Sequence, residues 1–142
     1  MQVLVINGPN LNLLGTRRPD IYGETTLREL EDRCRRWGID SGATVTTLQS
    51  NHEGAIIDAL HGAIGRYDGV VLNPGALGHY SYALHDAIES IPVDVIEVHI
   101  SDIAARPEEW RHTSVIASVC AASIAGEGIE GYRIAIQRIA TV

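Results

Sequence analysis

The chain has 142 residues, which is near the usual size of one domain, and it carries a formal net charge of −7 at pH 7. This charge argues against nucleic acid as the main partner, because binding to phosphates needs a basic face. Apolar residues make up 45% of the chain, yet no apolar run reaches the length of a membrane span. We therefore expect one domain over residues 1–142, with no nucleic-acid and no membrane partner.

Short apolar runs alternate with segments of helical periodicity along the chain. From the amino terminus we expect strand Met1–Ile6, loop Leu13–Glu24, helix Thr26–Gly38, strand Ala43–Gln49, helix Glu53–Ile64, strand Gly69–Leu72, helix Ser81–Ser90, strand Val93–Ile100, loop Ser101–Thr113, a strand over most of Val115–Ala125 and helix Ile129–Ala140. A helix is the main alternative for Val115–Ala125. The first run reads as a strand rather than a signal peptide.

The alternation of strands and helices predicts the fold class. The apolar runs are continuous, which is typical of strands buried on both faces of a parallel sheet. We expect an α/β protein with a flavodoxin-like, doubly wound five-stranded parallel sheet in three layers. Ligands of such folds bind outside the carboxyl ends of the strands. Unusual polar residues lie at the carboxyl ends of four of the expected strands, at Asn7–Asn10, Ser50–Glu53, Asn73–Gly75 and Glu97–Ser101.

Two features of the composition limit the chemistry. Cys34 and Cys120 both lie in apolar segments, as small core residues of a cytoplasmic protein would. All eleven basic residues are Arg, so lysine Schiff bases and Walker-type phosphate loops are excluded. No spacing of His and carboxylates suggests a metal site. We therefore expect neither a metal nor a cofactor.

Glu97 and His99 form the first candidate pair. Residues two apart on a strand point to the same face, so the carboxylate can lie beside the imidazole. It would fix the tautomer of the ring and favour its protonated form, which makes His99 a candidate general acid. The alternative is a buried pair with a purely structural role.

Arg17 and Tyr22 form the second candidate pair, in the loop after the first strand. A phenol is a weak base at neutral pH, and a guanidinium held against it favours the phenolate. Gly15 and Gly23 flank the pair and would let the loop act as a lid. The alternative is a solvated loop in which Arg17 and Tyr22 have no joint role.

The remaining candidates would bind a polar ligand. Asn10, Asn73 and His79 supply neutral groups suited to hydroxyls and to a developing enolate oxygen, although Asn is also a common turn former. Arg106 and Arg111 could hold a carboxylate through paired hydrogen bonds, or could be surface charges beside neighbouring glutamates.

Several segments together resemble the type II dehydroquinases in order and spacing, over essentially the whole chain. They are Asn7–Arg17 with Pro19 and Tyr22-Gly23, Gln49–Gly54, Asn73–Ala76, His79–Ser81, Ile96–Ser101 and Gly128–Tyr132. The resemblance implies a hydro-lyase of the shikimate pathway, which converts 3-dehydroquinate to 3-dehydroshikimate by anti elimination of water through an enolate. The type I enzymes use a lysine imine instead, and the absence of Lys agrees with type II.

The resemblance also implies roles for single residues. Tyr22 would be the base, Arg17 would hold it as phenolate, Asn10 would stabilise the enolate, and His99 with Glu97 would protonate the leaving hydroxyl. The residues that would grip the substrate are Asn73, His79, Ile100, Ser101 and Arg111. Asp86 would reach the site of a neighbouring subunit, because the family assembles as a dodecamer of trimers.

Four departures from the family pattern bear on these roles. Arg18 stands where an acidic residue is common and could crowd Arg17. His85 replaces a common Arg before Asp86, and Gly78 replaces a common Ser or Thr. The loop 101–111 holds one extra residue if Arg111 is the substrate-binding arginine, and otherwise that position falls on Trp110.

Two other functions remain open from the sequence. The first is a flavodoxin-like module that binds a nucleotide or phosphate at Asn7–Asn10. The second is a paralogue that keeps the fold but has lost turnover. The sequence also leaves open whether the enzyme serves aromatic biosynthesis or quinate breakdown.

Overall fold

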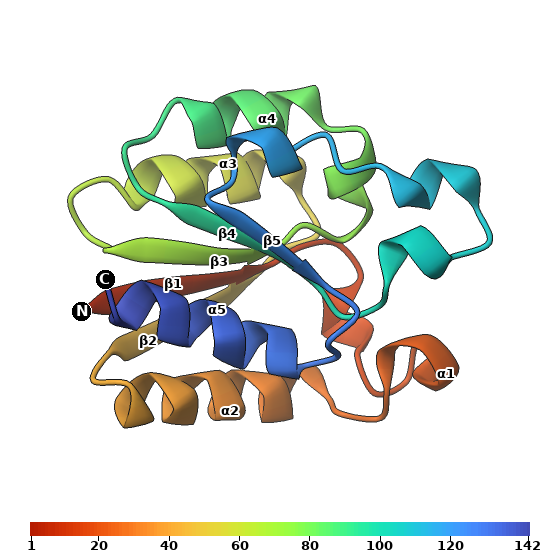
Figure 1. Cartoon of the computed structure of the whole chain (residues 1–142), viewed down its shortest axis with the longest axis horizontal. Coiled ribbons are helices and arrows are strands. Elements are labelled where there is room, and N and C mark those ends of the chain that lie inside the picture. Colours follow the sequence, from red (N-terminus) through yellow and green to blue (C-terminus); the bar gives the residue numbers. More distant parts are fainter.

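Five strands form one all-parallel sheet in the computed structural model, which describes residues 1–142 (Figure 1). The strands are β1 (Gln2–Asn7), β2 (Thr44–Gln49), β3 (Gly69–Asn73), β4 (Val95–His99) and β5 (Ala122–Ala125). Their order in the sheet is β2-β1-β3-β4-β5. This order is the flavodoxin-like one, so the fold class predicted from the sequence is confirmed.

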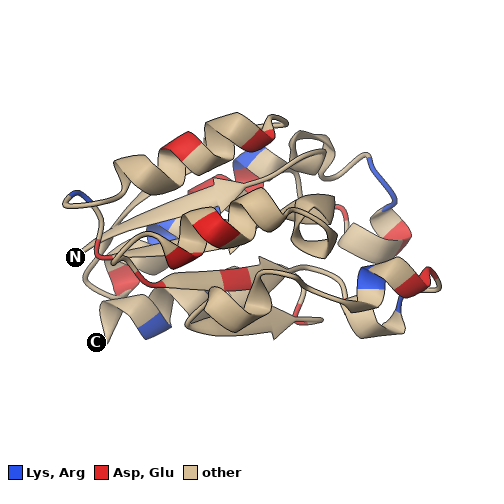
Figure 2. Ribbon diagram, turned by 90° about the horizontal axis from the view of Figure 1, so that it is seen from above, with Lys and Arg blue, Asp and Glu red and all other residues tan.

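Helices cover both faces of the sheet and complete three layers (Figure 1). The helices α2 (Leu27–Asp40) and α5 (Glu130–Ala140) lie on one face, and α3 (Glu53–Gly62) and α4 (Tyr82–Glu89) lie on the other. Each face has its own apolar cluster. The outer face of α3 and α4 carries acidic residues and no arginine (Figure 2). No helix combines the length and the apolar character that crossing a membrane would require.

Local sequence signals explain the helix boundaries. The Thr26 side chain accepts a hydrogen bond from the Glu29 N–H at 3.2 Å, which is one half of a capping box. The helix α2 continues past Gly38, where a stop was expected. Gly38 is buried within α2, and a Cβ at this position would lie only 2.5 Å from Cγ2 of Val45. This glycine therefore serves close packing of α2 on β2 rather than helix termination.

The prediction of a strand over most of Val115–Ala125 was wrong. Only Ala122–Ala125 pairs with β4, and Ala117–Val119 forms a 3-10 turn. Ile116 is fully buried in the apolar cluster beneath α3 and α4, and Val119 packs against the same cluster. The apolar character of this segment thus reflects packing against the helix layer, which a β-strand pattern cannot distinguish from packing in a sheet.

The two expected loops contain short helical turns. A helix α1 (Pro19–Tyr22) lies within Leu13–Glu24, begins with proline and carries Asp20 in its first turn, both of which favour a helix start. The loop after β4 contains the 3-10 turns Ile103–Ala105 and Glu109–His112. These turns give both loops a defined shape at the carboxyl edge of the sheet, where ligands are expected.

Candidate active site

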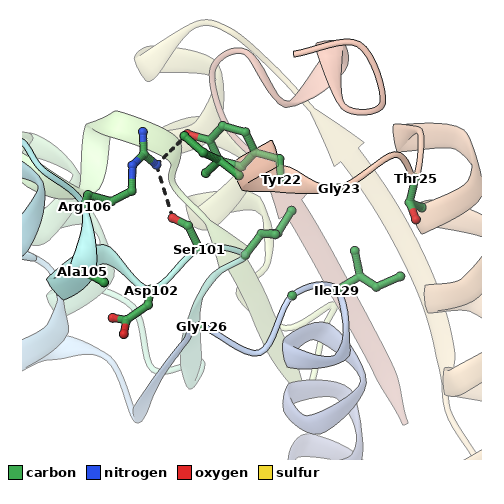
Figure 3. A pocket seen from close by; sticks show the side chains of 12 residues that line it. Tyr22, Gly23, Thr25, Ser101, Asp102, Ala105, Arg106, Gly126 and Ile129 are labelled. Atoms are coloured by element: carbon green, nitrogen blue, oxygen red, sulfur yellow. Dashed lines mark hydrogen bonds between the residues drawn. The ribbon is translucent and has the colours of Figure 1, made fainter. Parts of the chain in front are cut away.

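The loops after β1, β3 and β4 enclose a cavity of about 170 Å³ at the carboxyl edge of the sheet. Most of the site residues predicted from the sequence line it, namely Asn10, Arg17, Tyr22, Asn73, His79, His99, Ile100, Ser101 and Arg111. A larger hollow of about 510 Å³ shares Tyr22, Ser101 and Arg106 with this cavity (Figure 3). We place the chemistry in the smaller cavity, because His79 and His99 line it and neither lines the larger hollow.

Glu97 and His99 form the pair expected from their spacing on β4. The His99 Nε2 lies 2.7 Å from Oε2 of Glu97, and this carboxylate is 1% exposed. Burial alone would raise the pKa of Glu97, but hydrogen bonds from His99, Ser114 and Ser123 outweigh it and hold that pKa below its usual value. The pair is therefore a buried anion that supports a ring at the cavity wall. The contact between the two side chains is as expected, and the role of His99 as an acid stays a prediction.

His79 lies next to His99 in the cavity wall. The two rings are stacked with centroids 6.0 Å apart, and Nδ1 of His79 lies 2.8 Å from the Thr113 carbonyl oxygen. Burial lowers the pKa of His79, and the positive charges of His99 and Arg111 lower it further. A neutral His79 that donates from Nδ1 to Thr113 leaves Nε2 as an acceptor for a substrate hydroxyl.

The guanidinium that contacts the Tyr22 hydroxyl belongs to Arg106, which the sequence left as either a carboxylate ligand or a surface charge. Nη1 of Arg106 donates to the Tyr22 hydroxyl at 3.0 Å and to Oγ of Ser101 at 3.3 Å (Figure 3). Arg17 instead lies over the ring, with its Cζ 4.6 Å from the centroid. Two cations therefore surround one phenol, of which only Arg17 was expected there.

Arg111 lines the cavity, as its assignment by position after the aromatic residue requires. Its guanidinium carbon lies 4.1 Å from the ring centroid of Trp110, whose edge in turn meets the His79 ring. Its Nε is 3.1 Å from Oε2 of Glu108, as a close ion pair without hydrogen-bond alignment. The Arg111 guanidinium is therefore held by stacking on Trp110 and by the charge of Glu108. It also lines the cavity.

Asn10 is tied through its backbone and Asn73 through its side chain, by contacts that the sequence did not reveal. The Asn10 N–H donates to Oδ1 of Asn51 at 3.0 Å, which ties the first loop to the loop after β2. Asn73 is buried, and its Nδ2 donates to the hydroxyl of Tyr132 at 2.8 Å. That hydroxyl donates in turn to Oδ1 of Asn7 at 2.6 Å. Tyr132 was not among the predicted site residues, although it ends the family motif Gly128–Tyr132.

Asp86 does not reach this cavity within the chain. Its side chain is 78% exposed on α4, where the imidazole of His85 lies 3.1 Å from its carboxylate. Two other departures from the family pattern are Arg18 and Gly78. The Arg18 guanidinium lies 3.3 Å from the Asp20 carboxylate, which offsets its charge beside Arg17. A Cβ at Gly78 would lie 2.7 Å from Cγ of Pro74, so a larger residue at this buried position would require the Pro74 ring to shift.

Comparison with known proteins identifies the family. The sequence pattern of the family described as Dehydroquinase class II matches residues 1–140. A 3-dehydroquinate dehydratase of Bacillus licheniformis is 56% identical over 94% of this chain and 92% of that protein. A catabolic 3-dehydroquinase of Neosartorya fischeri is 50% identical over 97% of this chain and 91% of its own. A type II dehydroquinase structure from Propionibacterium acnes superimposes with a TM-score of 0.96 at 43% identity, covering 99% of this chain and 97% of that one. The chain belongs to the class II dehydroquinase family.

Proposed function

We propose that this protein is a 3-dehydroquinate dehydratase, which removes water from 3-dehydroquinate to give 3-dehydroshikimate in the shikimate pathway. The observation that carries this proposal is the shared cavity of Tyr22 and His99. The phenol is surrounded by two guanidinium groups, and the imidazole is backed by a buried carboxylate. A cation-stabilised base and an anion-supported acid in one small cavity suit an elimination in which a proton and a hydroxide leave.

The steps follow from this arrangement. Tyr22 as phenolate takes the proton beside the ketone, and the electron pair moves onto the carbonyl oxygen as an enolate. Asn10 stabilises that oxygen. The enolate then collapses and expels the hydroxyl, which His99 protonates, so that one water leaves. Arg17 and Arg106 balance the negative charge of the Tyr22 phenolate before it takes the proton.

The substrate is held by the rest of the cavity wall. The neutral ring of His79 accepts from a hydroxyl, and Arg111 contributes the cation facing the cavity. Ile100 and Ser101, at the end of β4, bind the carboxylate through backbone and hydroxyl groups, and the rigidly held Asn73 fixes its orientation. No metal or cofactor takes part in any of these steps.

The function is tested by ultraviolet absorbance of the purified protein with 3-dehydroquinate in the presence of a chelator. Elimination creates a conjugated enone carboxylate that absorbs where the substrate does not. We expect a steady rise whose rate is the same with and without chelator. Binding without a rise would indicate a paralogue that has lost turnover. Neither binding nor a rise would leave only a flavodoxin-like module with another ligand.

We further propose a cytoplasmic enzyme that assembles as a dodecamer of trimers. Two unpaired cysteines support the location. The assembly is supported by α4, where Asp86 is 78% exposed and Tyr82 is 73% exposed, so that both are free to meet a neighbouring subunit. Light scattering should give twelve times the chain mass, and Asp86→Asn should weaken turnover without changing that mass. A monomer with full activity would contradict the proposed role of Asp86.

A further inference from the structure

The Glu97 carboxylate accepts hydrogen bonds on both of its oxygens, and two of the donors lie outside β4. Oε2 accepts from Nε2 of His99 at 2.7 Å and from Oγ of Ser114 at 2.6 Å. Oε1 accepts from Oγ of Ser123, also at 2.6 Å. The carboxylate is 1% exposed, so these groups take the place of water around it.

These contacts have the geometry of bonds to an ionised carboxylate. Hydroxyl donors approach a carboxylate anion at about 2.5–2.7 Å, closer than they approach a neutral oxygen. Burial raises the pKa of Glu97, and the bonds from His99, Ser114 and Ser123 together outweigh it and lower that pKa. Without the two hydroxyls, His99 would remain as the one donor against the cost of burying the charge.

The fold directs both serines at Glu97. Ser123 is the register partner of Glu97 across the parallel pair β4–β5, so their side chains lie side by side on one face of the sheet. Ser114 precedes the turn Ala117–Val119, and its Oγ accepts a hydrogen bond from the Ala117 N–H at 3.1 Å. That bond occupies a lone pair of the Ser114 hydroxyl and leaves its hydrogen for Glu97.

His99 is the one basic side chain within ion-pair distance of Glu97. The charge of Glu97 also acts on His79 and on Cys120. The pKa of His79 is lowered, chiefly by burial, so this ring is neutral at pH 7. Burial raises the pKa of the Cys120 thiol to about 12, so it is neutral as well. Neither group therefore brings a second charge beside the Glu97–His99 pair.

We propose that Ser114 and Ser123 are positioning residues of the elimination, which hold Glu97 as a fixed anion behind His99. The anion keeps Nε2–H of His99 pointed at β4 and leaves Nδ1, which has no partner in the protein, for the leaving hydroxyl. The inference rests on the proposed function for the role of His99 as the acid. The hydrogen-bond arrangement itself does not depend on that function.

The test compares Ser123→Val with Ser123→Thr, since the two side chains have the same shape and only threonine keeps the hydroxyl. The valine variant should lower kcat about tenfold with KM little changed, as expected for the loss of one bond to a charged group. In ligand-free protein, carbon NMR of Glu97 should show its titration moved to higher pH. The threonine variant should resemble the wild type in both measurements, as should Ser118→Ala on the neighbouring turn. Ser114→Ala is a second variant with the same expected direction.

Three outcomes decide the matter. Equal losses in the valine and threonine variants would show that the serine only fills space and would overturn the proposal. Wild-type titration of Glu97 in both valine and Ser114→Ala variants would overturn it as well. The third outcome is a wild-type protein without turnover, together with a Ser123→Val variant in which Glu97 titrates at higher pH than in the wild type. This result would refute the proposed function and support the role of the serines.

Discussion

Tyr22→Phe is expected to lower kcat by between about a hundredfold and ten-thousandfold, the range in which a positioned base contributes. The substitution removes one oxygen from a half-buried side chain and keeps the ring under Arg17, so binding should persist. Stopped-flow absorbance at saturating 3-dehydroquinate measures kcat, and calorimetric titration measures binding. Tyr67→Phe, which alters a tyrosine away from the cavity, should leave both quantities unchanged.

The same assay separates the two arginines around Tyr22. Arg106 reaches the hydroxyl itself, whereas Arg17 lies over the ring. We therefore expect Arg106→Ala to lower kcat at least as far as Arg17→Ala does, because Arg106 contacts the oxygen that takes the proton. Full turnover in Tyr22→Phe would exclude the phenol as the base, whatever the arginine variants show.

His99→Ala is expected to produce the second large loss, again by between about a hundredfold and ten-thousandfold in kcat. The leaving hydroxyl would lose its proton donor, and the Glu97 carboxylate, which is 1% exposed, would lose one of its three hydrogen-bond partners. Steady-state kinetics should show kcat falling much more than KM rises. His61→Ala, on the exposed side of α3, is the matched control.

A double variant refines this prediction. Because Glu97 acts through His99, Glu97→Gln combined with His99→Ala should cost little more than His99→Ala alone. Independent, additive losses would mean that Glu97 has a role of its own. Turnover in His99→Ala close to that of the wild type would remove His99 from the reaction and leave only the structural interpretation of the pair.

Local patterns in the sequence were sufficient for the layout of the fold. Four of the five strands and the helices from α2 to α5 appear where apolar runs and helical spacing placed them, with ends shifted by a few residues. The same local logic found Glu97 and His99, since a spacing of two on a strand fixes a shared face. The family motifs then supplied roles for the residues at the carboxyl edge of the sheet.

Contacts between distant segments could be decided only by the tertiary structure. Arg106 and Tyr22 are 84 residues apart, and Tyr132 and Asn7 are 125 residues apart. The two serines that hold Glu97 come from different segments, Ser114 before the turn Ala117–Val119 and Ser123 from β5, and only packing brings both to one carboxylate. Periodicity reports which face of an element is apolar, but it carries no information on which loops meet above the sheet. The fold class and the core of the candidate site were thus determined by the sequence, and the partners of each site residue by the packing of loops that no local pattern encodes.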